Sequence, residues 1–211
     1  PILIDAEESW IQEAIDRICV QMMKKYNKEK AIVYNTIQLY RWDRLEFLKE
    51  SFAKSQKEGY HIGVKLVRGA YMEKERKRAE NQGYPSPIQP DKPATDRDYD
   101  LAIEFCVENN IAVCVGTHNE ASSMLMVQLL EKRGSDKKNE AFYFAQLLGM
   151  SDHISFNLSN EGFNVAKYVP YGPVKEVMPY LIRRAEENTS VAGQTSRELA
   201  LISSEMKRRK L

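Results

Sequence analysis

Short apolar runs alternate along the chain with longer stretches in which apolar residues recur at helical spacing. Six runs rich in β-branched and aromatic residues predict strands, at residues 2–6, 31–38, 62–70, 111–118, 141–148 and 165–172. Helical spacing follows the strands, as between residues 10 and 22 and between residues 119 and 134. Because no hairpin signal joins two strands, the pattern predicts six strand–helix units of a parallel sheet.

The two faces of the predicted strands differ. Val64 and Leu66 share one face, and Gly63 and Lys65 share the other. The run 111–118 behaves in the same way, with branched residues on one face and Ala112, Cys114, Gly116 and His118 on the other. A doubly wound sheet is covered by helices on both faces and should be apolar on both. One apolar face, and one that turns polar at the strand ends, favours part of a (β/α)8 barrel.

About six of the eight units of such a barrel are visible, which predicts one domain over residues 1–211. The proline-rich stretch 83–95 is interpreted as a loop within one unit. The chain opens inside an apolar strand-like run and without an initiator Met. We therefore expect the N-terminal units to be absent and the chain to be the C-terminal part of a longer protein.

Composition narrows the function classes. With 43% apolar and 29% charged residues and a net charge of +1, the chain resembles an ordinary globular protein and gives no sign of nucleic-acid binding. The three cysteines form no CxxC pair, which fits a reducing intracellular compartment. No metal-binding spacing, GxGxxG, GxxxxGK or GxSxG motif occurs, so we expect no metal site and no Rossmann or P-loop nucleotide site.

Two charged residues at strand ends are candidates for chemistry. A lysine such as Lys65 on the inner face of a buried strand costs several kcal/mol unless an anion meets it. The alternative is a lysine whose ammonium reaches solvent at the strand end. Asp5 occupies the equivalent place on the first strand, where a helix cap or a supporting ion pair is an equal alternative. His118 follows another strand, and a single histidine there is commonly a structural donor.

Arg183 and Arg184 are neighbours in a predicted helix. They are either two solvated charges, with Glu187 at ion-pair spacing, or a clamp that converges on one anion. The basic run at residues 207–210 is most simply a solvated helix end, and weak attraction to an anionic membrane surface is the alternative.

Several long motifs carry a resemblance to a known family. In order along the chain they are "LIDAEES", "VYNTIQLY", "VKLVRGAYMEKERKRA", "VGTHN", "FAQLLGM" and "KYVPYGPVKEVMPYLIRRAEEN". Together they resemble the proline dehydrogenase (proline oxidase) family, and the monofunctional enzymes in particular. The resemblance implies a distorted (β/α)8 TIM-type barrel, bound FAD, and oxidation of L-proline to Δ1-pyrroline-5-carboxylate. It also implies a quinone-type electron acceptor.

The resemblance also implies roles for individual residues. Lys65 matches the basic residue near flavin N5, and Asp5 matches an acid counted with the active site. The expected FAD contacts are Gln38, Lys65, Arg68, Gly69, Ala70, Thr117 and His118. The expected substrate pocket consists of Tyr168, Arg183, Arg184 and Glu187, in which the arginines clamp the proline carboxylate and Glu187 holds them.

One departure from the family matters. In the family an earlier strand supplies a lysine near Asp5 and the substrate carboxylate, and this chain contains no such strand. We therefore expect these 211 residues alone to have an open barrel and an incomplete site. The alternatives are a catalytically incomplete barrel that serves as a structural or binding module, and a 4-hydroxyproline dehydrogenase. Tyr168 argues against the latter if its ring covers C4 of the substrate.

The expected location is intracellular. The resemblance favours the bacterial cytoplasm, with peripheral contact to the inner membrane, and the mitochondrial matrix side is the alternative.

Overall fold

The chain forms two compact units, Pro1–Tyr168 and Val169–Leu211. The computed structural model describes residues 1–190 and 194–209, except the side chains of residues 183–190, 194–199, 201 and 202. The first unit holds all the strands of the described chain, and the second holds its last two helices. The organisation of residues 1–211 as one domain stays a prediction.

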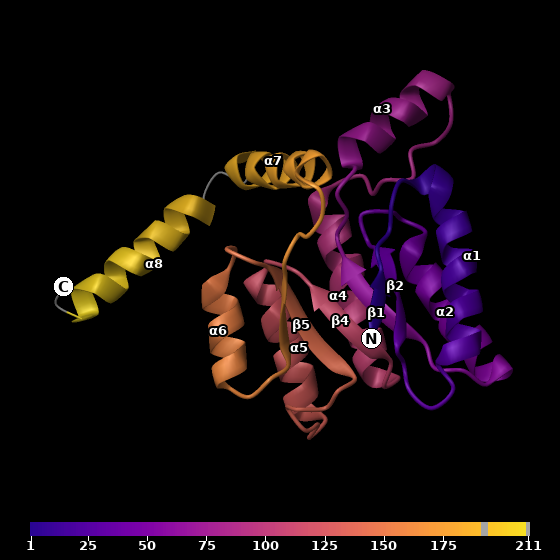
Figure 1. The fold of residues 1–211 in the computed structure, drawn as a ribbon, viewed down its shortest axis with the longest axis horizontal. Helices are drawn as coiled ribbons and strands as arrows, with labels where there is room; N and C mark the ends of the chain where they lie inside the picture. Colours follow the sequence, from indigo (N-terminus) through magenta and orange to yellow (C-terminus); the bar gives the residue numbers. More distant parts are fainter. Residues whose placement is uncertain (191–193, 210–211) are drawn as a thin grey trace. The chain divides into compact units, whose positions relative to one another are not determined.

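The first unit is built on a curled parallel sheet, with its helices on the outside (Figure 1). Its strands are β1 (Ile2–Ile4), β2 (Val33–Gln38), β3 (Gly63–Val67), β4 (Ala112–Gly116), β5 (Phe142–Leu147) and β6 (Val165–Tyr168). Every strand pairs with the next one in the chain, in the order β1-β2-β3-β4-β5-β6. A doubly wound sheet would reverse its order at a switch point. The unbroken order confirms the prediction of a partial TIM-type barrel.

Helices connect the strands. They are α1 (Ser9–Tyr26), α2 (Arg44–Glu58), α3 (Met72–Gln82), α4 (Lys92–Glu108), α5 (Glu120–Lys132) and α6 (Asp152–Asn160). The second unit contains α7 (Val174–Ser190), with Pro179 inside it, and α8 (Gln194–Arg209). In the part of the chain that the structure describes, no helix is long and apolar enough to span a membrane.

The hydrophobic core lies between the sheet and the helices. Val64, Leu66, Val113 and Val115 are fully buried and belong to this core. The opposite face of β3 and β4 carries Lys65, whose side chain is 18% exposed, and its register partner Cys114. The predicted difference between the two strand faces is confirmed, because only one face packs against helices.

The prediction of a loop over residues 83–95 is wrong at its end, where α4 begins at Lys92. Asp91 caps this helix by accepting a hydrogen bond from the backbone N–H of Ala94, and Pro93 occupies its first turn. Proline at the start of a helix needs no backbone donor and has a suitable φ. The run Asp-Lys-Pro was therefore a helix start, and two helices lie between β3 and β4.

The apolar stripe of α1 does not pack on the sheet. Ile11 and Ile18 are 42% and 52% exposed, whereas Gln12 and Asp16 are buried. Asp16 pairs with Arg44 of α2 at 2.8 Å. The helix was correctly predicted from its periodicity, but its buried face combines the polar Gln12 and Asp16 with Cys19 and Met23.

Candidate active site

Asp5 and Lys65 form an ion pair at the carboxyl ends of the strands. Lys65 lies on β3, and Asp5 directly follows β1, so the pair spans the intervening strand β2. The Lys65 Nζ also lies 5.7 Å from the centre of the Tyr168 ring, at the end of β6. The structure thus brings together three of the residues predicted from the sequence. It also shows that the lysine on the inner face meets an anion.

Small residues leave room around the Lys65 side chain. Gly116 is the clearest case, because a Cβ there would lie 3.1 Å from the Leu66 carbonyl oxygen and 3.8 Å from Lys65 Cε. Its register partner on β5 is Ala145, which in turn pairs with Ala166 of β6. A flat group could therefore lie over the ends of β4 to β6 without meeting a large side chain from these positions.

Arg68 points toward α4 and α5. Its Nε donates to Asp96 at 2.6 Å, and its two terminal nitrogens donate to Thr117 Oγ1 at 2.9 Å and Ser122 Oγ at 3.0 Å. The guanidinium also lies 4.2 Å from the centre of the Tyr99 ring. Burial alone would raise the pKa of Asp96, but hydrogen bonds from Lys92 and Arg68 outweigh it and hold that pKa below its usual value. Arg68 and Thr117, both predicted cofactor residues, are thus in direct contact.

Gly69 packs against Tyr40, in the connection between β2 and α2. Gly69 has a φ of 132°, and a Cβ there would lie 2.4 Å from the Tyr40 ring. Only glycine fits such a backbone conformation under an aromatic ring. Gln38 is the last residue of β2 and is 4% exposed, with Val67 as its register partner. Ala70 follows in the same turn before α3.

His118 links the loops that follow β4 and β5. Its Nδ1 lies 3.0 Å from Ser151 Oγ. Ser151 begins α6 in the left-handed conformation, with φ 50°. In the same pair of loops, His153 Nε2 lies 2.9 Å from Glu120 Oε1. The contact with Ser151 gives His118 a structural partner, and its role as an FAD contact stays a prediction.

Sequence reasoning missed a cluster that joins α3 to the start of α1. Glu75 is fully buried and accepts hydrogen bonds from the Ser9 backbone N–H at 2.6 Å and the Ser9 hydroxyl at 2.7 Å. Tyr71 donates its hydroxyl to Glu7 at 2.7 Å. These contacts join residues more than 60 positions apart. No local periodicity could have indicated them.

The predicted substrate clamp falls on α7. The helical backbone of Arg183, Arg184 and Glu187 is described, but their side chains lie outside the described residues. Their part in a substrate pocket therefore stays a prediction.

The donors at the mouth fit a flavin dinucleotide. Lys65, Gln38 and His118 come from three strand ends and offer a cation and neutral polar groups. Arg68 and Thr117 lie next to each other, and the charge of Arg68 is paired with Asp96. Among the described residues, no group of three or more His, Cys, Asp or Glu side chains is placed to hold a metal ion.

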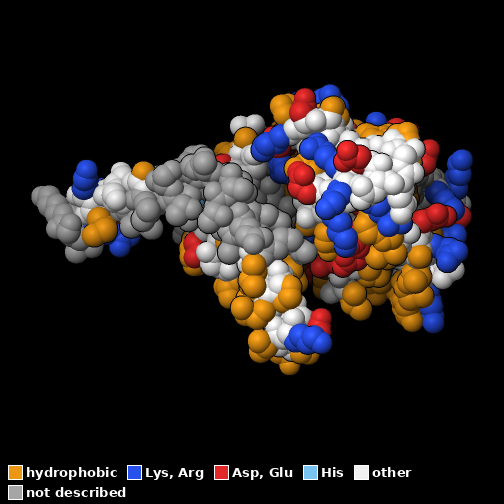
Figure 2. Space-filling view, turned by 90° about the horizontal axis from the view of Figure 1, so that it is seen from above, with side chains coloured by type: hydrophobic (Ala, Val, Ile, Leu, Met, Phe, Trp, Pro, Cys, Tyr) orange, Lys and Arg blue, Asp and Glu red, His pale blue; other side chains and the backbone are white. Residues whose placement is uncertain are grey.

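Charged groups of both signs are interleaved on this end of the first unit. Figure 2 looks down on the end that carries α3, where basic and acidic side chains lie next to each other. Lys74 of α3 pairs there with Glu8, and Arg78 lies 4.3 Å from the centre of the Trp10 ring. The mouth is therefore held by pairs of charges rather than dominated by one sign.

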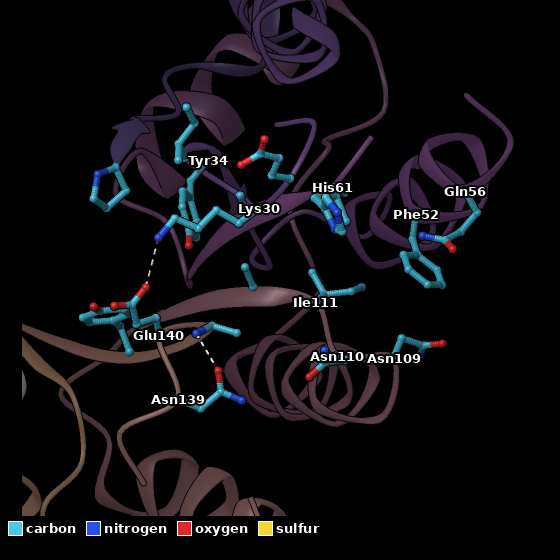
Figure 3. A pocket seen from close by; sticks show the side chains of 18 residues that line it. Lys30, Tyr34, Phe52, Gln56, His61, Asn109, Asn110, Ile111, Asn139 and Glu140 are labelled. Atoms are coloured by element: carbon cyan, nitrogen blue, oxygen red, sulfur yellow. Dashed lines mark hydrogen bonds and ion pairs between the residues drawn. The ribbon is translucent and has the colours of Figure 1, made fainter. Parts of the chain in front are cut away.

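A cavity of about 520 Å³ lies at the opposite end of the strands (Figure 3). It is lined by the first residues of strands, such as Tyr34 and Tyr143, and by segments that precede strands, such as those with His61 and Asn110. Lys30 and Glu140 make an exposed ion pair at its edge. Among the sequence-predicted site residues whose side chains the structure describes, none lines this cavity.

Comparisons with known sequences point to one protein family. The sequence model of one protein family, described as "Proline dehydrogenase", matches residues 1–197. The chain is 40% identical over 220 residues to "Proline dehydrogenase 1, mitochondrial" of Drosophila melanogaster, and the match covers 99% of this chain and 32% of the relative. It is 39% identical over 214 residues to "Hydroxyproline dehydrogenase" of Xenopus laevis, with 99% of this chain and 46% of the relative covered.

Solved structures share the fold. Proline utilization A (PutA) from Bdellovibrio bacteriovorus, inactivated by N-propargylglycine, matches with a TM-score of 0.83 and 29% identity over 90% of this chain and 20% of that chain. The chain spans about a third of the length of the Drosophila melanogaster relative and a fifth of the PutA chain.

Proposed function

The chain belongs to the proline dehydrogenase family, and on that premise we propose that the protein oxidises L-proline to Δ1-pyrroline-5-carboxylate with FAD and a quinone-type acceptor. One observation carries the proposal. Lys65 lies on the inner face of the barrel, where its side chain is 18% exposed, and Asp5 is its charge partner. Burying the Lys65 ammonium is costly even though Asp5, at 52% side-chain exposure, pairs with it, so a lysine retained at a barrel mouth supports a role in the chemistry.

The reaction removes a hydride from proline C5 and a proton from its nitrogen. FAD, when bound, supplies the hydride acceptor. Lys65 would place a fixed positive charge at the cofactor edge, where negative charge arrives with the hydride. Asp5 holds that ammonium in place from the adjacent loop. Gln38, His118, Arg68, Gly69, Ala70 and Thr117 would hold the cofactor.

Contacts to the carboxylate of proline would orient the substrate. Arg183 and Arg184 would clamp it, with Glu187 holding the pair, because long guanidinium arms from adjacent helical positions can converge on one carboxylate. Losing one partner of a desolvated charge pair costs about 2–5 kcal/mol. We therefore expect Arg184→Ala and Arg183→Ala to raise KM for proline sharply at unchanged FAD content. An unchanged KM in both variants would return the arginines to solvated charges.

Oxidation of 4-hydroxyproline is a second candidate, favoured by the similarity to the Xenopus laevis hydroxyproline dehydrogenase. Tyr168 stands against it if its ring, next to Lys65, covers C4 of the substrate, since a hydroxyl there would clash or lose its partner. The ratio of kcat/KM for L-proline and for trans-4-hydroxy-L-proline decides between the two substrates.

The experiment that tests the proposal is purification of the full-length protein followed by anaerobic addition of proline. We expect yellow protein whose flavin absorbance is bleached by L-proline. A colourless protein, or a flavin that proline does not reduce, would favour a barrel that serves as a structural or binding module.

Relatives named as mitochondrial favour the mitochondrial alternative for the location over the bacterial cytoplasm. Peripheral attraction to a membrane through the basic run at 207–210 is weakened by Glu205, which pairs with both Arg208 and Arg209. Fractionation of the source cells, with matrix and membrane markers, tests the location.

A further inference from the structure

The loop after β1 and the first turns of α3 are fastened to each other. We call this set of contacts the Glu75 clasp, and it consists of Glu7, Glu8 and Ser9 on one side and Tyr71, Lys74 and Glu75 on the other. Both sides lie at the end of the first unit where α3 stands (Figure 1). Because β2 separates β1 from β3, the clasp closes over the end of β2.

Glu75 replaces a helix cap that α1 lacks. Glu8 is the residue before α1, and its side chain makes no capping hydrogen bond. The first N–H groups of a helix need an acceptor and lie at the positive end of the helix dipole. Glu75 comes from another helix and meets this need with one carboxylate oxygen, which accepts from the Ser9 N–H, while its other oxygen accepts from the Ser9 hydroxyl. Glu75 itself is 0% exposed, so Ser9 is its main source of compensation.

The clasp and the Asp5–Lys65 pair hold the same short segment. Only the four residues from Asp5 to Glu8 separate β1 from α1. Asp5 is tied to Lys65 on β3, and Ser9 is tied to Glu75 on the helix that follows β3. A shift of the start of α1 would therefore move Asp5 relative to Lys65.

We infer that Glu75 is a positioning residue, which holds Asp5 against Lys65 through Ser9 and so sets the place of the charge at the mouth. The inference rests on the proposed function, because it assigns a role in proline oxidation to a residue outside the expected site. Its rival is a merely structural role, in which Glu75 only stabilises α1.

The test compares Glu75→Gln with Asp98→Asn in the full-length, flavin-loaded protein. Asp98 is also a buried carboxylate, but it lies on α4, where it pairs with Arg97 at 2.9 Å and accepts from Gln89 at 2.6 Å. Both variants should lower the melting temperature. Only Glu75→Gln should slow flavin reduction by proline, by about ten- to a hundred-fold, because a displacement of about 1 Å has that effect on an oriented reaction. The pH profile of reduction should shift with it.

Hydrogen exchange of residues 6–12 gives a readout independent of activity. It should rise in Glu75→Gln and stay unchanged in Asp98→Asn. Ser9→Ala keeps the backbone donor and should give a smaller change in the same direction, so it serves if Glu75→Gln does not fold. Reduction rates and exchange that are equal in Glu75→Gln and Asp98→Asn would overturn the inference. Wild-type flavin that proline fails to reduce would contradict the proposed function instead, and the exchange comparison would still decide the role of Glu75.

Discussion

The two ends of the half-barrel are held together by different chemistry. At the carboxyl ends of the strands, loops are joined by charges, as in Asp5 with Lys65 and Arg68 with Asp96. At the amino ends, a neutral side chain does this work. Asn27 is fully buried, donates to the carbonyls of Val33 and His61, and accepts from the N–H groups of Ile32 and Val33, all at 2.8–3.0 Å.

Partly burying a charged group costs more free energy than burying a hydrogen-bonded neutral amide. At the amino end the ion pair next to the cavity, Lys30 with Glu140, lies in solvent at 71% and 77% side-chain exposure. Barrel enzymes place their active sites at the carboxyl ends of the strands, so chemistry there gives a reason for the cost of the charges at that end. The comparison therefore assigns function to the charged end and stability to the neutral one.

The largest effect is expected from Lys65→Met in the full-length protein. Flavin reduction by proline should slow by about 100-fold or more with FAD retained, since the charge acts only as negative charge develops. Lys30→Met is the matched control, and its rate should be that of the wild type. Equal rates in the two variants would erase the contrast between the ends.

Asn27→Ala should have the opposite effect, lowering stability and leaving activity unchanged. Removing its buried hydrogen bonds should lower the free energy of unfolding by about 2 kcal/mol. Activity per folded molecule and KM for proline should stay unchanged, because the residue lies far along the strands from the mouth. Urea unfolding and steady-state kinetics on the same samples measure both. A large rise in KM would show that the amino end also shapes the site.

A smaller effect is expected from Asp96→Asn, and it depends on pH. The pKa of Asp96 is lowered in the folded protein, so its contribution to stability is fully present above the unfolded-state pKa. It is lost as pH falls through the folded-state pKa, below about 4. Wild type should exceed Asp96→Asn by no more than about 1 kcal/mol at neutral pH. The difference in free energy of unfolding should shrink in acid, and a difference that grows in acid would contradict the assignment.

The smallest effect concerns thiol labelling. Burial raises the pKa of Cys114, beside Lys65, to about 11, with Asp5 adding to the rise and Lys65 opposing it. Since the thiolate is the reactive form, iodoacetamide should label Cys114 slowly in the folded protein and quickly in urea. Rapid labelling of the folded protein would mean that the mouth opens far more than the structure shows.

Alternation of apolar and polar residues made the strands and their faces predictable, because burial on one face requires that pattern. The strand order then placed Asp5 and Lys65 at one end. The inner face of α1 could not be predicted, since Asp16 is buried only because Arg44 of another helix meets it. The role of Glu75 could not be predicted either, because its partner Ser9 is 66 residues away in the sequence. The start of α4 was readable from Asp91 and Pro93, but the nearby prolines favoured a loop.

The most direct test is a crystal structure of the full-length protein with FAD and an unreactive cyclic analogue of proline that keeps the carboxylate. The account predicts the flavin ring at the carboxyl ends of the strands, with its edge next to Lys65, and the analogue between the flavin and Tyr168. Both ligands bound in the cavity lined by Tyr34, His61 and Asn110 at the opposite end would contradict it.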